Sequence, residues 1–128
     1  MTPGHHRRPA LAALTVLTVL TAAGAGLLSG CTPQAPDPGR FVGDALDVAM
    51  AQLHSPNVID LSEPILGVDA SYAPDDDDAD WLVVVACYAP NAQQTSDVAV
   101  IPKAAATAEI RAAAKRGEYE RYVPSCGG

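Results

Sequence analysis

The chain has 128 residues, with 8 basic and 15 acidic side chains and a formal net charge of −7. This excess of carboxylates argues against nucleic-acid binding and against electrostatic binding to anionic lipid, because both depend on Lys and Arg. The length leaves room for one small domain with a modest hydrophobic core.

The N-terminus has the pattern of an exported protein. Arg7 and Arg8 precede a run from residue 10 to residue 28 that contains only Ala, Leu, Val, Thr and Gly. A charged head, an apolar centre and small residues before a cleavage point predict a secretory signal peptide. A run of about 20 apolar residues can also span a bilayer, so its length alone leaves a permanent membrane span open.

The end of this run carries a more specific pattern. Leu28-Ser29-Gly30-Cys31 resembles the lipobox of bacterial lipoproteins, in which a Leu and two small residues precede a Cys. The resemblance implies cleavage after Gly30 and a lipid on Cys31. It places the protein at the extracytoplasmic face of the cell membrane, anchored by that lipid. Residues 1–30 are then the signal peptide, and the remaining 98 residues carry 6 basic and 15 acidic side chains, a net charge of −9.

The cysteine count agrees with export. If Cys31 carries lipid, Cys87 and Cys126 form an even pair outside the cytosol, where disulfides persist. A bond between them would close a loop of about 40 residues and stabilise the fold by roughly 4 kcal/mol. Two free thiols are the alternative. The absence of a Cys-x-x-Cys pair gives a zinc site little support, and no cofactor is expected.

After Cys31, three Pro in residues 31–40 predict an extended tether that holds the domain some 25 Å from the lipid. Apolar residues at three- and four-residue spacing then predict a helix over residues 43–54, ended by Pro56. Residues 57–61 and 65–71 have the composition of strands or extended segments.

Five Asp occur within residues 75–80. The run lacks the Gly and the bidentate Glu that an EF-hand calcium loop needs, so we expect a solvated loop and no metal site. Calcium binding in another geometry stays open.

The second half contains the clearest strand. Residues Trp81–Tyr88 are apolar throughout, which predicts a central strand buried on both faces. A turn at Pro90 and a strand over residues 97–101 complete an antiparallel hairpin. An Ala-rich helix over residues 104–116 follows, with Gly117 as its cap. The predicted fold class is α+β, with an N-terminal helix on a small, mainly antiparallel three-stranded sheet and a C-terminal helix tied back by the disulfide.

This order of elements resembles the PASTA domain. The resemblance covers residues 41–102 and depends on a helix entry, a helix face, a turn and a final strand. The matching residues are Val42-Gly43, Leu46, Ala49, Tyr88-Ala89-Pro90 and Val98-Ala99-Val100. It implies a single PASTA-like domain over residues 41–128, with a C-terminal helical extension, and a role in binding cell-wall material.

The sequence favours a binding protein over an enzyme. His54 is the single histidine after the signal peptide, and its neighbour Ser55 does not by itself make a nucleophile-base pair. We therefore expect a non-enzymatic binding module in the cell envelope, with its contact surface near Trp81, Tyr88 or the turn. The alternative is a structural or interaction lipoprotein that docks a membrane or envelope protein through residues 118–122 or through the acidic loop.

Overall fold

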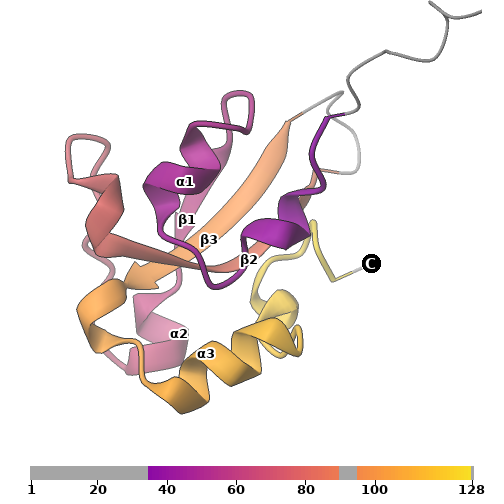
Figure 1. Ribbon diagram of the computed structural model, residues 1–128. Coiled ribbons are helices and arrows are strands. Elements are labelled where there is room, and N and C mark those ends of the chain that lie inside the picture. The colour runs from indigo at the N-terminus through magenta and orange to yellow at the C-terminus, as the bar shows by residue number, and fades with distance from the viewer. Residues whose placement is uncertain (1–34, 90–94, 128) are drawn as a thin grey trace, which may run out of the picture. The chain divides into compact units, whose positions relative to one another are not determined.

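In a computed structural model that describes residues 35–89 and 95–127, a three-stranded sheet lies between two layers of short helices (Figure 1). The strands are β1 (Asn57–Asp60), β2 (Trp81–Tyr88) and β3 (Ser96–Pro102), and the α-helices are α1 (Leu46–Met50), α2 (Ser62–Leu66) and α3 (Ala108–Lys115). The strand order is β1-β3-β2, with β3 antiparallel to β2 and parallel to β1. The predicted α+β class is confirmed, and the sheet is mixed, with the longer pairing antiparallel.

The strand β2 has the predicted bounds but not the predicted position. β3 is central and β2 lies at the edge, so the prediction of a central strand over Trp81–Tyr88 is wrong. Residues 43–45 close part of the outer edge of β2. The Gly43 amide donates to the Val83 carbonyl at 2.8 Å, and the Val83 amide donates to the Asp44 carbonyl at 2.9 Å. Because these residues shield part of its edge, β2 can be apolar on both faces without leaving those backbone N–H and C=O groups open to pairing with another chain.

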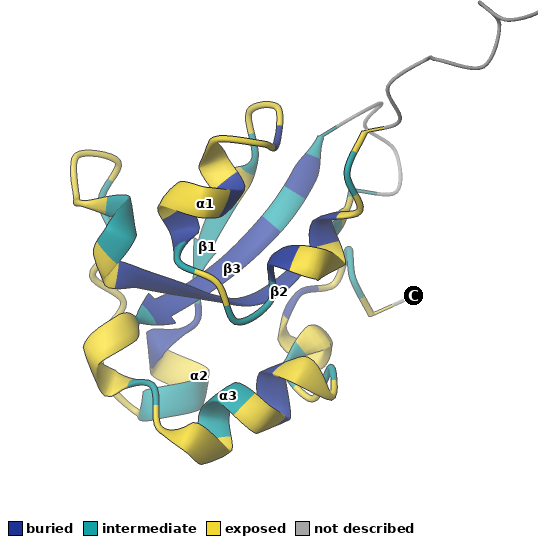
Figure 2. Cartoon of the chain, viewed as in Figure 1, coloured by how far each residue is buried: buried dark blue, intermediate teal, exposed yellow. Residues whose placement is uncertain are grey.

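Two apolar cores lie on opposite faces of the sheet (Figure 2). On one face, Phe41, Leu46 and Ala49 pack against Val83 and other strand residues. The other face is covered by α2, α3 and the C-terminal segment. A bulge between Val83 and Val85 turns two successive valines, Val84 and Val85, toward this second core. The sheet is therefore buried on both sides, which accounts for the uninterrupted apolar composition of β2.

The first α-helix is shorter than the predicted range of residues 43–54. α1 spans Leu46–Met50 and continues as turns, with the Leu53 amide donating to the Ala49 carbonyl at 2.8 Å. Residues 43–45, the predicted start of the helix, are not helical because they pair with β2. Gly43 has a φ of +97°, a backbone conformation that favours glycine. The predicted apolar face of Ala45, Leu46, Ala49, Met50 and Leu53 is correct in part. Leu46, Ala49 and Leu53 are buried, Ala45 is partly buried, and Met50 is exposed.

The extended segment predicted over residues 65–71 is wrong at its start. Residues Ser62–Leu66 form α2, which ends at Gly67 with a φ of +71°. Pro64 is tolerated because it lies in the first turn, where a backbone N–H has no partner within the helix. The β-branched and apolar pair Ile65-Leu66 suggested a strand, but one turn of helix turns both side chains toward the second core.

The remaining elements follow the sequence closely. β1 and β3 match the strands predicted over residues 57–61 and 97–101. The helix predicted over residues 104–116 is divided into a 3-10 turn, Lys103–Ala105, and α3, because the Thr107 side chain caps α3 by accepting from the Ile110 amide. Gly117 follows α3 in the left-handed conformation, as expected for its cap.

The folded part begins before residue 41. Pro38–Phe41 form a 3-10 turn capped by the Asp37 side chain, and the Pro38 side chain is fully buried. The phenol of Tyr88 donates to the Pro36 carbonyl at 2.8 Å. The last residues assigned to the tether are thus fixed against the domain. Within the described ranges, no helix is long and apolar enough to cross a membrane.

Candidate functional site

In the part of the chain that the structure describes, a concavity lies at the Trp81 end of β2. It has a volume of about 750 Å³ and opens between the acidic loop and the segment that follows β3. Its lining combines carboxylates, one ammonium group, one hydroxyl group and apolar surface: Ser71, Asp76, Asp77, Asp80, Trp81, Pro102, Lys103 and Ala104. We call this concavity the acidic pocket. From the sequence we expected a contact surface near Trp81, and the acidic pocket lies there.

The acidic loop is held in shape by its own carboxylates. Asp76 accepts from the Ala73 amide at 2.8 Å, and Asp77 accepts from the Ala79 amide at 3.0 Å, which caps the 3-10 turn Asp78–Asp80. These bonds are local side chain-to-backbone contacts typical of Asp in turns. Asp75 and Asp80 are exposed, as the solvated loop predicted from the sequence requires. Among the described residues, no group of three metal-ligating side chains comes together.

An aromatic pair supports the floor of the acidic pocket. The rings of Tyr72 and Trp81 meet edge to face, with centroids 5.1 Å apart, and Trp81 is 6% exposed. The Tyr72 hydroxyl donates to Asp78 at 3.2 Å. Burial raises the pKa of Tyr72, and the negative charges of Asp78 and Asp76 raise it further. Tyr72 thus packs as a neutral phenol against Trp81, whose ring lines the acidic pocket.

The opposite wall carries a single cation. Lys103 follows β3, and its Nζ donates to the Ala79 carbonyl at 3.2 Å, which ties this wall to the end of the acidic loop. The lining thus holds three carboxylates against one ammonium group. Since the whole chain is also acidic, the potential in the acidic pocket favours positively charged groups.

Sequence reasoning missed the most heavily bonded carboxylate in the described structure. Asp60 ends β1, and its Oδ1 accepts from the amide and hydroxyl of Ser62 at 2.8 and 2.5 Å. Its Oδ2 accepts from the amides of Ser71 and Tyr72 at 2.7 and 2.9 Å. Burial opposes ionisation of Asp60, but the bonds from Ser62, Tyr72 and Ser71 outweigh it and lower the pKa. Asp60 thereby fixes the segment that carries Ser71 and Tyr72 to the acidic pocket.

A signal for Asp60 was present in the sequence. An Asp at a strand end, before a polar Ser-Glu-Pro stretch, is typical of an Asx-turn, in which the carboxylate accepts from the amide two residues on. The bonds from Ser71 and Tyr72 had no such signal, because they join residues 11 and 12 positions apart.

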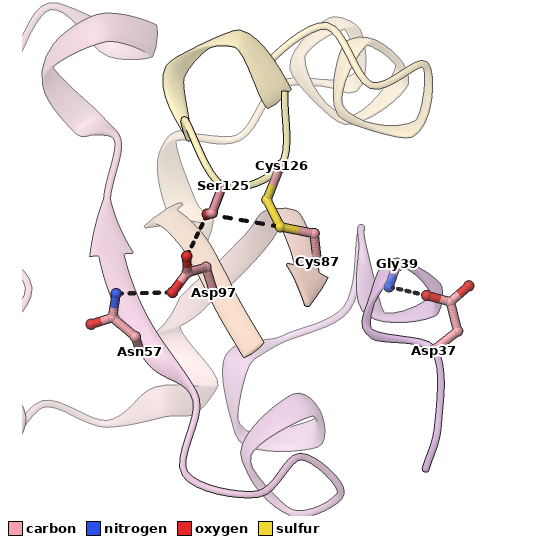
Figure 3. Close-up of a disulfide and its surroundings, with 7 residues drawn as sticks. All are labelled: Asp37, Gly39, Asn57, Cys87, Asp97, Ser125 and Cys126. Carbon is pink, nitrogen blue, oxygen red and sulfur yellow. Dashed lines mark hydrogen bonds between the residues drawn. A yellow bond between two sulfur atoms is a disulfide. The ribbon is translucent and has the colours of Figure 1, made fainter. Parts of the chain in front are cut away.

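The disulfide predicted between Cys87 and Cys126 is present, with their Cα atoms 5.5 Å apart (Figure 3). Beside it, the Ser125 hydroxyl donates to Asp97 and lies 4.0 Å from the Cys87 sulfur. Asp97 also accepts from the Asn57 side chain at 3.1 Å, so one carboxylate joins β1, β3 and the C-terminal segment. The disulfide has a structural setting, and the C-terminal segment is fixed by both a covalent and a polar link.

The other residues singled out in the sequence lie apart from the acidic pocket. Tyr88 is at the far end of β2, 43% exposed, and shares a small pocket of about 70 Å³ with His54 and Ser96. Cys31 lies outside the described residues, as do the signal peptide and the turn at Pro90. The structure thus separates two surfaces that the sequence had considered together, one around Trp81 and one around Tyr88.

Comparisons with known protein families, with curated proteins and with solved structures found no match for this chain.

Proposed function

We propose that the chain is a cell-envelope lipoprotein, anchored through Cys31, whose PASTA-like domain is a non-enzymatic binding module for cell-wall material. The acidic pocket is its ligand site. The observation that carries this proposal is a concavity of about 750 Å³ with three carboxylates at its rim and an aromatic side chain in its lining. Pockets that combine apolar surface with a few placed polar groups are typical ligand sites.

The lining selects the chemistry of the ligand. Asp76, Asp77 and Asp80 favour an ammonium group, while Trp81 and Pro102 offer apolar surface to the body of the ligand. Amine-bearing peptides of the cell wall combine these two properties. An extended acidic surface also increases the rate at which such cationic groups are captured.

The lining favours binding over catalysis. His54 lies on another surface of the domain, and both oxygens of Asp60 are occupied by hydrogen-bond donors. The remaining carboxylates of the acidic loop are exposed or partly exposed, which is a poor setting for the raised pKa of a general acid.

A pull-down on purified peptidoglycan tests the proposal. Asp80→Lys reverses a charge in the pocket lining, whereas Asp75→Lys makes the same change of net charge in the same exposed loop but outside the lining. We expect Asp80→Lys to weaken binding several-fold, because the change replaces an attraction for an ammonium group with a repulsion, and exposed charge contacts are worth about 0.2–1 kcal/mol each. Asp75→Lys should retain most binding. Retention no higher than that of a charge-matched control protein, or equal loss in both variants, would refute the pocket as the site.

A second candidate function has one observation in its favour. Tyr122 is 37% exposed, and the Arg121 guanidinium lies over its ring at 4.9 Å from the centroid. Tyr and Arg are among the side chains enriched at protein interfaces, so this pair is suited to dock a membrane or envelope protein. Crosslinking in intact membranes through position 122 tests it, and the capture of lipid alone would count against it.

A further inference from the structure

The attachment of residues 36–38 to the domain fixes how far the domain can stand from a lipid anchor. Tyr88 holds the Pro36 carbonyl, Asp37 caps the turn that follows, and Pro38 is fully buried. Only residues 31–35 therefore separate the proposed anchor at Cys31 from the first residue that is fixed to the domain. Four residues of fully extended chain span at most about 14 Å. The distance of some 25 Å expected from the sequence counted all of residues 31–40 as tether. Residues 36–38 and those after them are instead part of the folded domain.

The point of attachment lies at one end of the molecule. Ala35 and Pro36 line the small pocket with Gln52, His54 and Tyr88, at the end of β2 opposite to Trp81. Figure 1 shows the described chain starting at the end of the β2–β3 hairpin, away from the acidic loop. Eight residues of strand separate the two ends, which is about 23 Å at the usual rise per residue.

The two ends also differ in charge. The lining of the small pocket contains no carboxylate: its residues are Ala35, Pro36, Gln52, Leu53, His54, Tyr88 and Ser96. The opposite end carries the acidic loop and its carboxylates. A negatively charged membrane surface repels the five Asp of the acidic loop more strongly than the opposite end, which Asp37 and Asp97 flank. At that opposite end a half-exposed Tyr offers the amphipathic ring that membrane interfaces favour.

From these three observations we infer that the surface around Gln52, His54 and Tyr88 is a membrane-facing surface that lies against the lipid headgroups. The acidic pocket then opens away from the bilayer, toward the cell wall. This inference rests on the proposed lipid anchor at Cys31. It adds the orientation of the domain: the short tether brings one end to the headgroups, and the length of β2 carries the pocket away from them.

Fluorescence quenching in vesicles tests the orientation. Trp81 is the only tryptophan of the chain, so Trp81→Phe provides a background in which one tryptophan can be placed at either end. Gln52→Trp reports on the membrane-facing surface and Asp75→Trp on the acidic end; both positions are exposed. The lipidated chain, cleaved after Gly30, is inserted into vesicles of phosphatidylcholine and phosphatidylglycerol that carry nitroxide-labelled headgroups. We expect the tryptophan at position 52 to be quenched several-fold more strongly than the one at position 75.

An insertion serves as the second arm. Ten Gly and Ser residues between Cys31 and Ala35 give a flexible reach of about 20 Å, and they should reduce the quenching at position 52 toward that at position 75. Equal quenching of the two variants, or stronger quenching at position 75, would overturn the orientation while leaving the anchor intact. Mass spectrometry of Cys31 separates the two failures, since a chain without lipid would overturn both the anchor and the orientation.

Discussion

Replacing Asp60 with Asn is the sharpest test of how the acidic pocket is supported. The carboxylate accepts four hydrogen bonds, two at each oxygen. An amide has one accepting oxygen, so two of the four donors lose their acceptor whichever way the Asn side chain turns. Leaving a partly buried donor without an acceptor costs about 1–2 kcal/mol. The expected loss of unfolding free energy is therefore about 2–4 kcal/mol, a large share of the roughly 5–15 kcal/mol of a typical domain.

Urea denaturation at pH 7 measures this loss. With the usual slope for a small protein, the midpoint of Asp60→Asn should fall by about 1 M or more. Asp69→Asn is the matched control, because Asp69 is exposed and makes no hydrogen bond among the described residues. A loss below about 0.5 kcal/mol in Asp60→Asn, or one equal to that of the control, would refute the supporting role of Asp60.

The stability difference between the natural chain and Asp60→Asn should also depend on pH. The pKa of Asp60 is lower in the folded protein than its ordinary value of 3.8, so its ionised form contributes stability above that value. This contribution is lost as the pH falls through the folded pKa, because a protonated carboxyl resembles an amide. The stability gap between the natural chain and Asp60→Asn should be complete at pH 6 and should narrow below pH 3.8. If the difference in unfolding free energy between the two chains stayed constant down to pH 2, ionisation of Asp60 could not be its cause.

Three further predictions concern the rest of the fold. Replacing both Cys87 and Cys126 with Ala should cost about 4 kcal/mol of unfolding free energy by the loop-closure relation for a separation of 39 residues, measured by denaturation under non-reducing conditions. Because the pKa of Tyr72 is raised above 10.0, the neutral phenol stabilises the fold below that pH, and this contribution is lost as the pH rises through the folded pKa. Thermal melts should therefore show a steeper alkaline loss in the natural chain than in Tyr72→Phe. Gly67→Ala should cost about 1 kcal/mol or slightly more, because no atom lies within 4 Å of the added Cβ and only the left-handed backbone resists it.

Each of these has a matched comparison. Ser125→Ala removes the polar link beside the disulfide but keeps the covalent one, so it should cost less than the double Cys variant. An equal loss would assign the stability to the Asp97 contact. Alkaline melts of Tyr72→Phe that parallel those of the natural chain would remove Tyr72 as the titrating group. A Gly67→Ala variant as stable as the natural chain would show that the turn after α2 relaxes freely.

Local patterns in the sequence were sufficient to predict the three strands and the disulfide, although they also predicted an extended segment over residues 65–71 whose start is part of α2. β-branched composition marks β1, β2 and β3 within one or two residues, and the parity of the cysteines pairs Cys87 with Cys126. The order of the strands could not be read in this way. An apolar strand is expected in the centre of a sheet, but β2 is shielded by helices on both faces and by residues 43–45 along its edge. That arrangement depends on long-range contacts with no local signal.

The candidate site was predictable only in outline. Trp81 and the acidic run indicated the region, since both are conspicuous in the sequence. The participation of Lys103, Pro102 and Ser71 depends on how three distant segments meet at one end of the sheet. The separation of Trp81 from Tyr88 follows from β2 being a continuous strand, which places its two aromatic ends at opposite ends of the molecule.

The position of β3 has a consequence for how the chain acquires its structure. β1 and β2 each pair with β3 and not with one another, and β3 is the last strand to be synthesised. A chain that has emerged only as far as residue 95 therefore has two strands with no partner and cannot form the sheet. Folding has to wait for residues 96–102 and then join segments about 40 residues apart, which favours a slow and cooperative assembly.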